Sequence, residues 1–286
     1  MLATIDLRLK FYTFGLYLYN RMKGFIKKHE VWIFLTLAPL LNAVITYASS
    51  KGIIVGYAYQ HGRFFALLSF LICVVIFTRG IKGVKDLFRP MLIWKINPKW
   101  YLFSLLFALT ICAFALLLKS FYYGIDYSSL MKFDFPPLQI SFMLLAWAFM
   151  GEVVWVSYAI RELSKMLRPF YASQVIGFFW TCWWLPSVLI DVGVISDLPI
   201  WALLLNMMGA AGMCAVIYGK TKSGVCVWIL QFMLNMSLLI LPVSPTVGGV
   251  PTYQAFAVLY YIAMLGFMYF MNPASERALG LKPNPR

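Results

Sequence analysis

The sequence predicts an all-α fold, a polytopic bundle of about eight transmembrane helices. Of its 286 residues, 62% are hydrophobic and only 12% are charged. The mean hydropathy of +0.81 is well above that of soluble domains. Apolar runs of about 20 residues, the length that a helix needs to cross the hydrocarbon core, recur along the chain. Because backbone polar groups in lipid must be satisfied within the segment, such runs indicate helices.

The apolar runs occupy most of the chain and leave no room for a separate soluble domain. They lie near 31–49, 63–78, 100–118, 138–160, 170–190, 199–218, 223–242 and 254–271. We therefore expect three parts: a basic and aromatic interfacial segment at 1–30, a transmembrane bundle at 31–271, and a cytoplasmic tail at 272–286.

The net charge of +14 is explained by orientation in a membrane and does not indicate a nucleic-acid partner. Most of the 24 Lys and Arg residues fall in alternate connecting segments and in the two terminal segments. The positive-inside rule then places both termini in the cytoplasm, in agreement with an even number of spans. The sequence predicts a multi-pass integral protein of a bacterial inner or plasma membrane, with membrane lipids as partners.

The first elements carry several interfacial and helix-bending residues. Residues 1–30 have the composition of a helix that lies in the interface. Pro39 is expected to kink the first span. The basic segment 79–100 is predicted to be a loop with a short interfacial helix. His61 falls in the preceding outer loop, 51–62, and is interpreted as a surface histidine.

The later spans carry the polar residues that attract a functional interpretation. Glu152 is the only carboxylate well inside an apolar run, and a charge at that depth costs about 2.5 kcal/mol or more. Helical spacing places Trp155, Val156 and Ala159 on its face. A neutral, hydrogen-bonded Glu152 with a structural role is the alternative to a functional site.

Two further features concern the spans after Glu152. Trp180 and Trp184 are four residues apart on the fifth span, and Gln231 and Asn235 share a face of the seventh. The small residues of the sixth span, 209–215, allow close helix packing. All five cysteines lie in apolar runs without metal-ligand spacing, so no metal or cofactor is predicted.

Three of these segments resemble the motifs of the CPBP family of intramembrane proteases, which includes CAAX prenyl endopeptidases and Abi bacteriocin-immunity proteins. The family's E-E-x-x-x-R, F/W-x-x-x-H and H-x-x-x-N/D motifs correspond to segments 151–156, 180–184 and 231–235. Ser157 and Tyr158 also match the small residue and Tyr that usually follow the first motif. The resemblance implies a CPBP-like core at about 80–242.

Most of the chemical residues of those motifs are replaced in this chain. In the best register, Gly151 stands at the first Glu, Val156 at the Arg, Trp184 at one His and Gln231 at the other. Glu152 and Asn235 alone match the family's catalytic set. The family activates a water with its Glu and His residues, a role that indole and amide groups do not perform. The resemblance therefore implies a degenerate site with little or no protease activity.

Three functions remain open at this level. The first is a catalytically inactive CPBP-like protein that binds a transmembrane helix or a lipidated peptide, as a scaffold, regulator or immunity-type protein. The second is an active intramembrane endopeptidase that uses Glu152. The third is a small transporter or lipid-handling protein. In the first case we expect Glu152, Trp184, Gln231 and Asn235 to face one another, with Glu152 bonded to Gln231, Asn235 or a backbone carbonyl.

Overall fold

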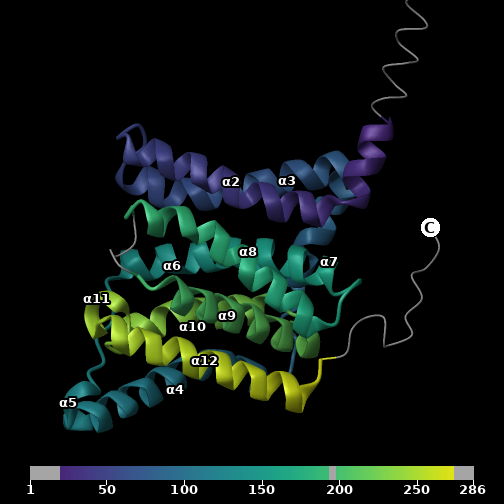
Figure 1. Ribbon diagram of the computed structural model, residues 1–286. Coiled ribbons are helices and arrows are strands. Elements are labelled where there is room, and N and C mark those ends of the chain that lie inside the picture. The colour runs from purple at the N-terminus through teal and green to yellow at the C-terminus, as the bar shows by residue number, and fades with distance from the viewer. Residues whose placement is uncertain (1–19, 193–197, 274–286) are drawn as a thin grey trace, which may run out of the picture.

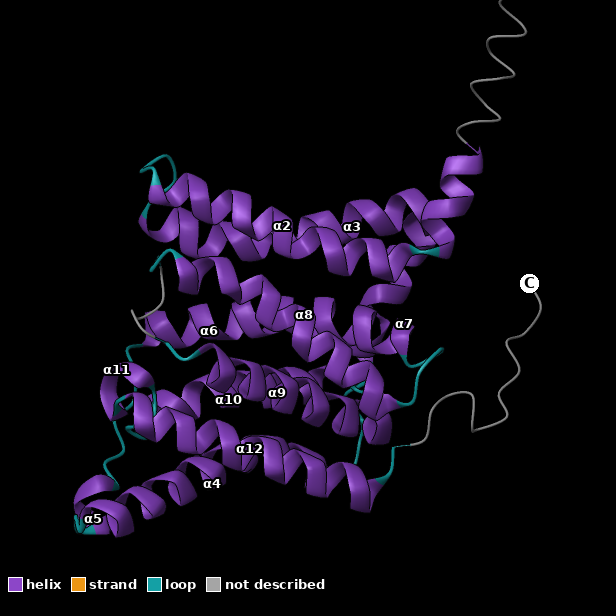
Figure 2. Cartoon of the chain, in the orientation of Figure 1, coloured by secondary structure: helices purple, strands orange, loops and turns teal. Residues whose placement is uncertain are grey.

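The computed structural model describes residues 20–192 and 198–273, and these residues form helices and connecting loops without any strand (Figure 2). The predicted interfacial segment 1–30 and tail 272–286 therefore lie largely outside the described residues. Residues 20–28 are helical. The further elements are α2 (Glu30–Ser50), α3 (Gly56–Phe88), η1 (Arg89–Leu92), α4 (Pro98–Tyr123), α5 (Tyr127–Leu130), α6 (Leu138–Gly151), η2 (Glu152–Ile160), α7 (Arg161–Leu163), α8 (Pro169–Leu189), α9 (Ile200–Thr221), α10 (Gly224–Ile240), α11 (Pro245–Gly248) and α12 (Val250–Met271).

The long helices run roughly side by side (Figure 1). The pair α2 and α3 forms one side of the bundle, and α4 and α12 form the opposite side. Between them lie α6, α8, α9 and α10, so these four helices and η2 supply most of the core. We call the end of the bundle where α2 begins and α7 lies the basic end.

Within the described residues, seven helical stretches are long and apolar enough to cross a membrane. This confirms a multi-pass helical membrane protein in its coarse form. The helix α8 has 21 residues, but it is not among the seven because Gln174 and its several Trp residues make it less apolar.

The segment around residues 79–100 differs from the predicted loop. The helix α3 continues to Phe88, and a single 3₁₀ turn follows it. Gly80 interrupts α3 with a φ of 66°, a left-handed conformation that side chains disfavour. The apolar part of α3 and its basic last turns thus form one helix with a kink at Gly80, where the helix axis changes direction.

One other local prediction was wrong, and a second residue is buried without a signal in the local sequence. His61 lies in α3, which begins at Gly56, and its Nδ1 accepts a hydrogen bond from Trp147 Nε1 at 3.2 Å. Glu30, for which no burial was predicted, is 3% exposed. The reason in both cases is a partner on a distant helix that the local sequence does not reveal.

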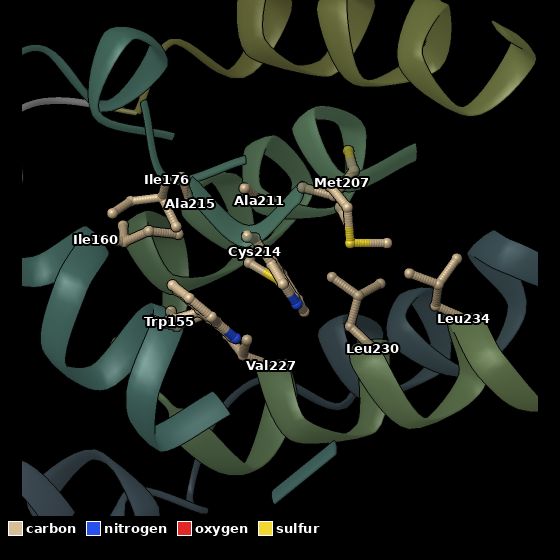
Figure 3. Close-up of a cluster of buried hydrophobic side chains, with 14 of the residues drawn as sticks. Trp155, Ile160, Ile176, Met207, Ala211, Cys214, Ala215, Val227, Leu230 and Leu234 are labelled. Atoms are coloured by element: carbon tan, nitrogen blue, oxygen red, sulfur yellow. The ribbon is translucent and has the colours of Figure 1, made fainter. Parts of the chain in front are cut away.

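Close helix packing around α9 follows from its small residues. A Cβ atom added to Gly177 of α8 would lie 2.5 Å from Met208 Cα, and one added to Gly209 would lie 2.9 Å from Tyr260 Cδ1. Figure 3 shows the resulting core, in which Ala211 and Cys214 face Val227 and Leu230, with Trp155 beside them. The predicted close packing is confirmed for Gly209 against α12, whereas on the α8 side the close contact depends on Gly177 of α8.

Candidate functional site: a tryptophan-walled cavity

A cavity of about 110 Å³ lies among α6, α8, α9 and α10, in the half of the bundle away from the basic end. It is lined by Phe64, Leu144, Trp147, Ala148, Gly151, Trp155, Trp180, Trp184, Asn206, Met207, Gln231, Leu234, Asn235 and Leu238. Water needs only about 10–15 Å³ of such space per molecule, so the cavity has room for a small group of atoms.

Aromatic rings form much of the wall and fix one another in place. Trp155 stacks on Trp180 with ring centroids 5.6 Å apart. Phe64 stacks on Trp147 at 4.8 Å and meets Trp184 edge-on at 6.2 Å. Aromatic pairs of this kind add about 0.5–1.5 kcal/mol each beyond their buried area. The cavity is therefore a preformed feature with a rigid wall.

Three amide side chains supply the polar part of the wall. Asn206 and Gln231 are both buried, and among the described residues Asn206 Oδ1 and Gln231 Nε2 have no hydrogen-bond partner. Asn206 Nδ2 donates to Tyr253 Oη at 3.0 Å, and Asn235 Nδ2 donates to the Gln231 carbonyl at 2.9 Å. An unpartnered buried polar group costs about 1–3 kcal/mol. The wall thus holds one unpaired amide oxygen and one unpaired amide NH2 group, both buried within it.

The structure brings together four of the six residues that the sequence singled out. Gly151, Trp184, Gln231 and Asn235 all line this cavity, although they come from three helices. Gly151 and Gln231 are close neighbours, since a Cβ atom added to Gly151 would lie 2.8 Å from Gln231 Oε1.

The other two residues, Glu152 and Val156, are not part of the cavity wall. Both are fully buried. Ser157 Oγ donates to Glu152 Oε1 at 2.7 Å, while Oε2 has no partner among the described residues. The same Oε1 lies 2.9 Å from the position of a Cβ atom added to Gly224, the first residue of α10. The expected bond from Glu152 to Gln231, Asn235 or a backbone carbonyl is therefore replaced by one to Ser157.

The reason for this difference is the π-helical geometry of η2, which covers nine residues. Hydrogen bonds from i to i+5 widen the turn, so the residue five positions on comes next to Glu152. That residue is Ser157. The prediction that Trp155 shares a face with Glu152 assumed an α-helix; in η2, Trp155 lines the cavity and Glu152 does not. The π-helix separates the acid from the cavity.

The cavity wall contains no Asp, Glu, His, Lys, Arg or Cys. Neither indole nor amide groups act as general bases near neutral pH. Across the described residues, no group of three or more His, Cys, Asp and Glu side chains is placed to hold a metal ion. The arrangement is suited to binding an uncharged, largely apolar group through ring contacts.

Sequence reasoning missed two contributors to this region. Asn206 lies in the apolar run 199–218, and its polarity there was the available signal. Arg63, the first residue of the apolar run 63–78, was given no role of its own, yet it is 3% exposed and its guanidinium carbon lies 4.2 Å from the ring centre of Trp184. Its position inside an aromatic-rich helix was a signal that charge counting overlooked.

Comparison with known protein families finds no family model that matches the chain, and comparison with curated proteins finds no match.

Proposed function

We propose that this chain is a catalytically inactive, CPBP-like membrane protein that binds a transmembrane or lipidated partner at the tryptophan-walled cavity. One observation carries the proposal. The positions that the motif resemblance aligns with catalytic residues, Gly151, Trp184, Gln231 and Asn235, surround one cavity, and none of them is an acid or a base.

The buried state of Glu152 supports a structural role for that residue. Its carboxyl group bonds Ser157 in its own helix and lies against the start of α10, outside the cavity wall. A general base must be within hydrogen-bond reach of its substrate or of a bound water. An endopeptidase that used Glu152 would need η2 to rearrange, so this alternative has less support.

The size of the cavity limits what enters it. A helix with its side chains is about 10–12 Å across, so a whole helix does not fit in about 110 Å³. A single apolar side chain or the end of a lipidated peptide does fit. That group would contact the rings of Trp155, Trp180 and Trp184. The rest of the partner would lie along the bundle surface.

A binding assay with a photo-reactive residue tests this proposal. We would replace Trp184 by a photo-crosslinking phenylalanine analogue and present the purified protein with a transmembrane peptide and a farnesylated peptide. The matched control places the same analogue at Phe178, an exposed residue of the same helix. Crosslinking at 184 but not at 178 supports the proposal. Equal crosslinking at both positions, or none, contradicts it.

An activity assay on the same peptides separates the rival functions. We expect no cleavage by the wild-type protein and little change in abundance for Glu152→Gln, which keeps an acceptor for Ser157. Glu152→Ala should lower stability by about 1–3 kcal/mol, because it removes that acceptor. Turnover that disappears in Glu152→Gln would establish an active protease. Uptake of lipid or solute into vesicles would favour the transporter alternative.

We also propose eight spans, including α8, with both termini in the cytoplasm. The support is the positive-inside pattern and the position of α8, which packs against α2 and α9 in the middle of the bundle. Reporters fused after Arg89 and Lys165 should be cytoplasmic, and a reporter after Ile125 should be external. A cytoplasmic signal at Ile125 would exclude this topology.

A further inference from the structure

A second hollow, distinct from the tryptophan-walled cavity, lies at the basic end of the bundle. It measures about 550 Å³ and is lined by Lys27, Arg79, Lys82, Gly83, Lys85, Asp86, Arg89 and Leu92. It lies beside the kink of α3 at Gly80, and its lining comes mainly from the last turns of α3 and from η1. Lys27 reaches the hollow from the helical residues 20–28 that precede α2.

Positive charge in this hollow is largely uncompensated. Its one acid, Asp86, already pairs with Arg161 at 2.9 Å, and Arg79 pairs with Glu30 and Glu162, each at 2.8 Å. Among the described residues, Lys27, Lys82, Lys85 and Arg89 make no ion pair. Four cations around one hollow create a field that attracts anions.

Large apolar side chains are exposed in the segments that carry these cations. Leu92, which lines the hollow, is 77% exposed, and Phe25, Ile81 and Trp94 are exposed nearby in the chain. A free anion gains nothing from such groups. A lipid binds more favourably, because its acyl chains cover the apolar side chains while its headgroup contacts the Lys and Arg side chains.

We propose that this hollow binds the phosphate of an anionic phospholipid headgroup. Arg89, Lys82, Lys85 and Lys27 supply the charge, and the exposed apolar residues contact the glycerol and acyl region. The phosphate chemistry is shared with free phosphate and glycerol phosphate, and the apolar surround selects the lipid. The proposal depends only on insertion in a membrane and is independent of the function of the tryptophan-walled cavity.

The test uses the purified full chain in a zwitterionic detergent, with fluorescently labelled phosphatidylglycerol as the probe. Phosphatidylcholine with the same chains is the comparison lipid. The triple variant Lys82→Gln, Lys85→Gln, Arg89→Gln should weaken phosphatidylglycerol binding at least about tenfold. The matched control, Lys95→Gln, Lys99→Gln, Lys220→Gln, loses the same charge from exposed positions outside the hollow and should bind as wild type does.

Three results would overturn the proposal. Equal binding of the two lipids removes headgroup selection. Equal weakening by both triple variants reduces the effect to general surface charge. Displacement of the labelled lipid by inorganic phosphate or glycerol 3-phosphate at the same concentration as by unlabelled phosphatidylglycerol assigns the site to a free anion. If the first triple variant does not remain monodisperse, Lys27→Gln with Arg89→Gln is judged by the same criteria.

Discussion

The helix α3 carries two arginines that the protein stabilises by different means. Arg79, at the basic end, meets two acids: its Nη2 lies 2.8 Å from Glu30 and its Nη1 lies 2.8 Å from Glu162. Arg63, in the other half, meets no acid among the described residues. Four aromatic rings surround it instead, with Trp184 at 4.2 Å and Tyr59, Phe64 and Trp183 at 5.2–5.3 Å.

The difference shows that a buried cation can be compensated by π-electron density as well as by carboxylates. Arg63 Nη1 donates to Ser187 Oγ at 2.9 Å, while its Nε has no partner in the described part of the chain. Arg79, by contrast, donates through three nitrogens to two carboxyl groups. Removing Arg79 would leave buried acids behind, and removing Arg63 would leave only rings and a hydroxyl.

The largest expected effect is that of Arg79→Met. It leaves Glu30, which is 3% exposed, without its cation, and breaking one side of a buried ion pair costs about 3–5 kcal/mol. The free energy of unfolding in mild detergent, measured by denaturant titration, should fall by that amount. A loss below about 1 kcal/mol would mean that the acids gain other partners or protons.

A smaller effect is expected for Arg63→Met. A desolvated cation–π contact contributes about 2 kcal/mol, and Met refills the ring cage with apolar atoms. We expect a loss of about 1–2 kcal/mol in the same titration, together with a change in tryptophan fluorescence from Trp183 and Trp184. A loss as large as that of Arg79→Met would indicate that Arg63 neutralises an acid.

The smallest effect is expected for Lys165→Met. Lys165 is 48% exposed and contacts Glu162 Oε2 at 2.8 Å, but Arg79 remains on the other oxygen of that carboxyl. Exposed ion pairs contribute about 0–1 kcal/mol. The unfolding free energy should change by less than 1 kcal/mol. A larger change would extend the buried network of Arg79 to this surface lysine.

Much of the architecture could be predicted from the sequence, because apolar length alone identifies membrane helices. The bounds of α10 and the close packing of α9 followed from the apolar runs and from the small residues at 209–215. The ring cage of Arg63 and the acid pair of Arg79 could not be predicted. Both depend on which helices become neighbours, and a single sequence does not contain that information.

In the candidate site, too, some features could be predicted from the sequence and others could not. The motif spacing identified four candidate residues, Gly151, Trp184, Gln231 and Asn235, and all four line one cavity. The orientation of Glu152 was wrong because helical-wheel reasoning assumes 3.6 residues per turn throughout. No composition signal in residues 152–160 distinguishes a π-helix from an α-helix.

The π-helix η2 also sets how α6, which precedes it, and α7, which follows it, are rotated relative to each other along one continuous helical span. Before it, α6 presents Gly151 to the cavity; after it, α7 presents Glu162 to Arg79. In an α-helix each residue turns the coil by about 100°. In the wider turns of a π-helix each residue turns the chain by less than this. The nine residues of η2 therefore rotate α7 relative to α6 by a different angle than α-helical winding would, and this angle lets a single span present Gly151 to the cavity and Glu162 to Arg79.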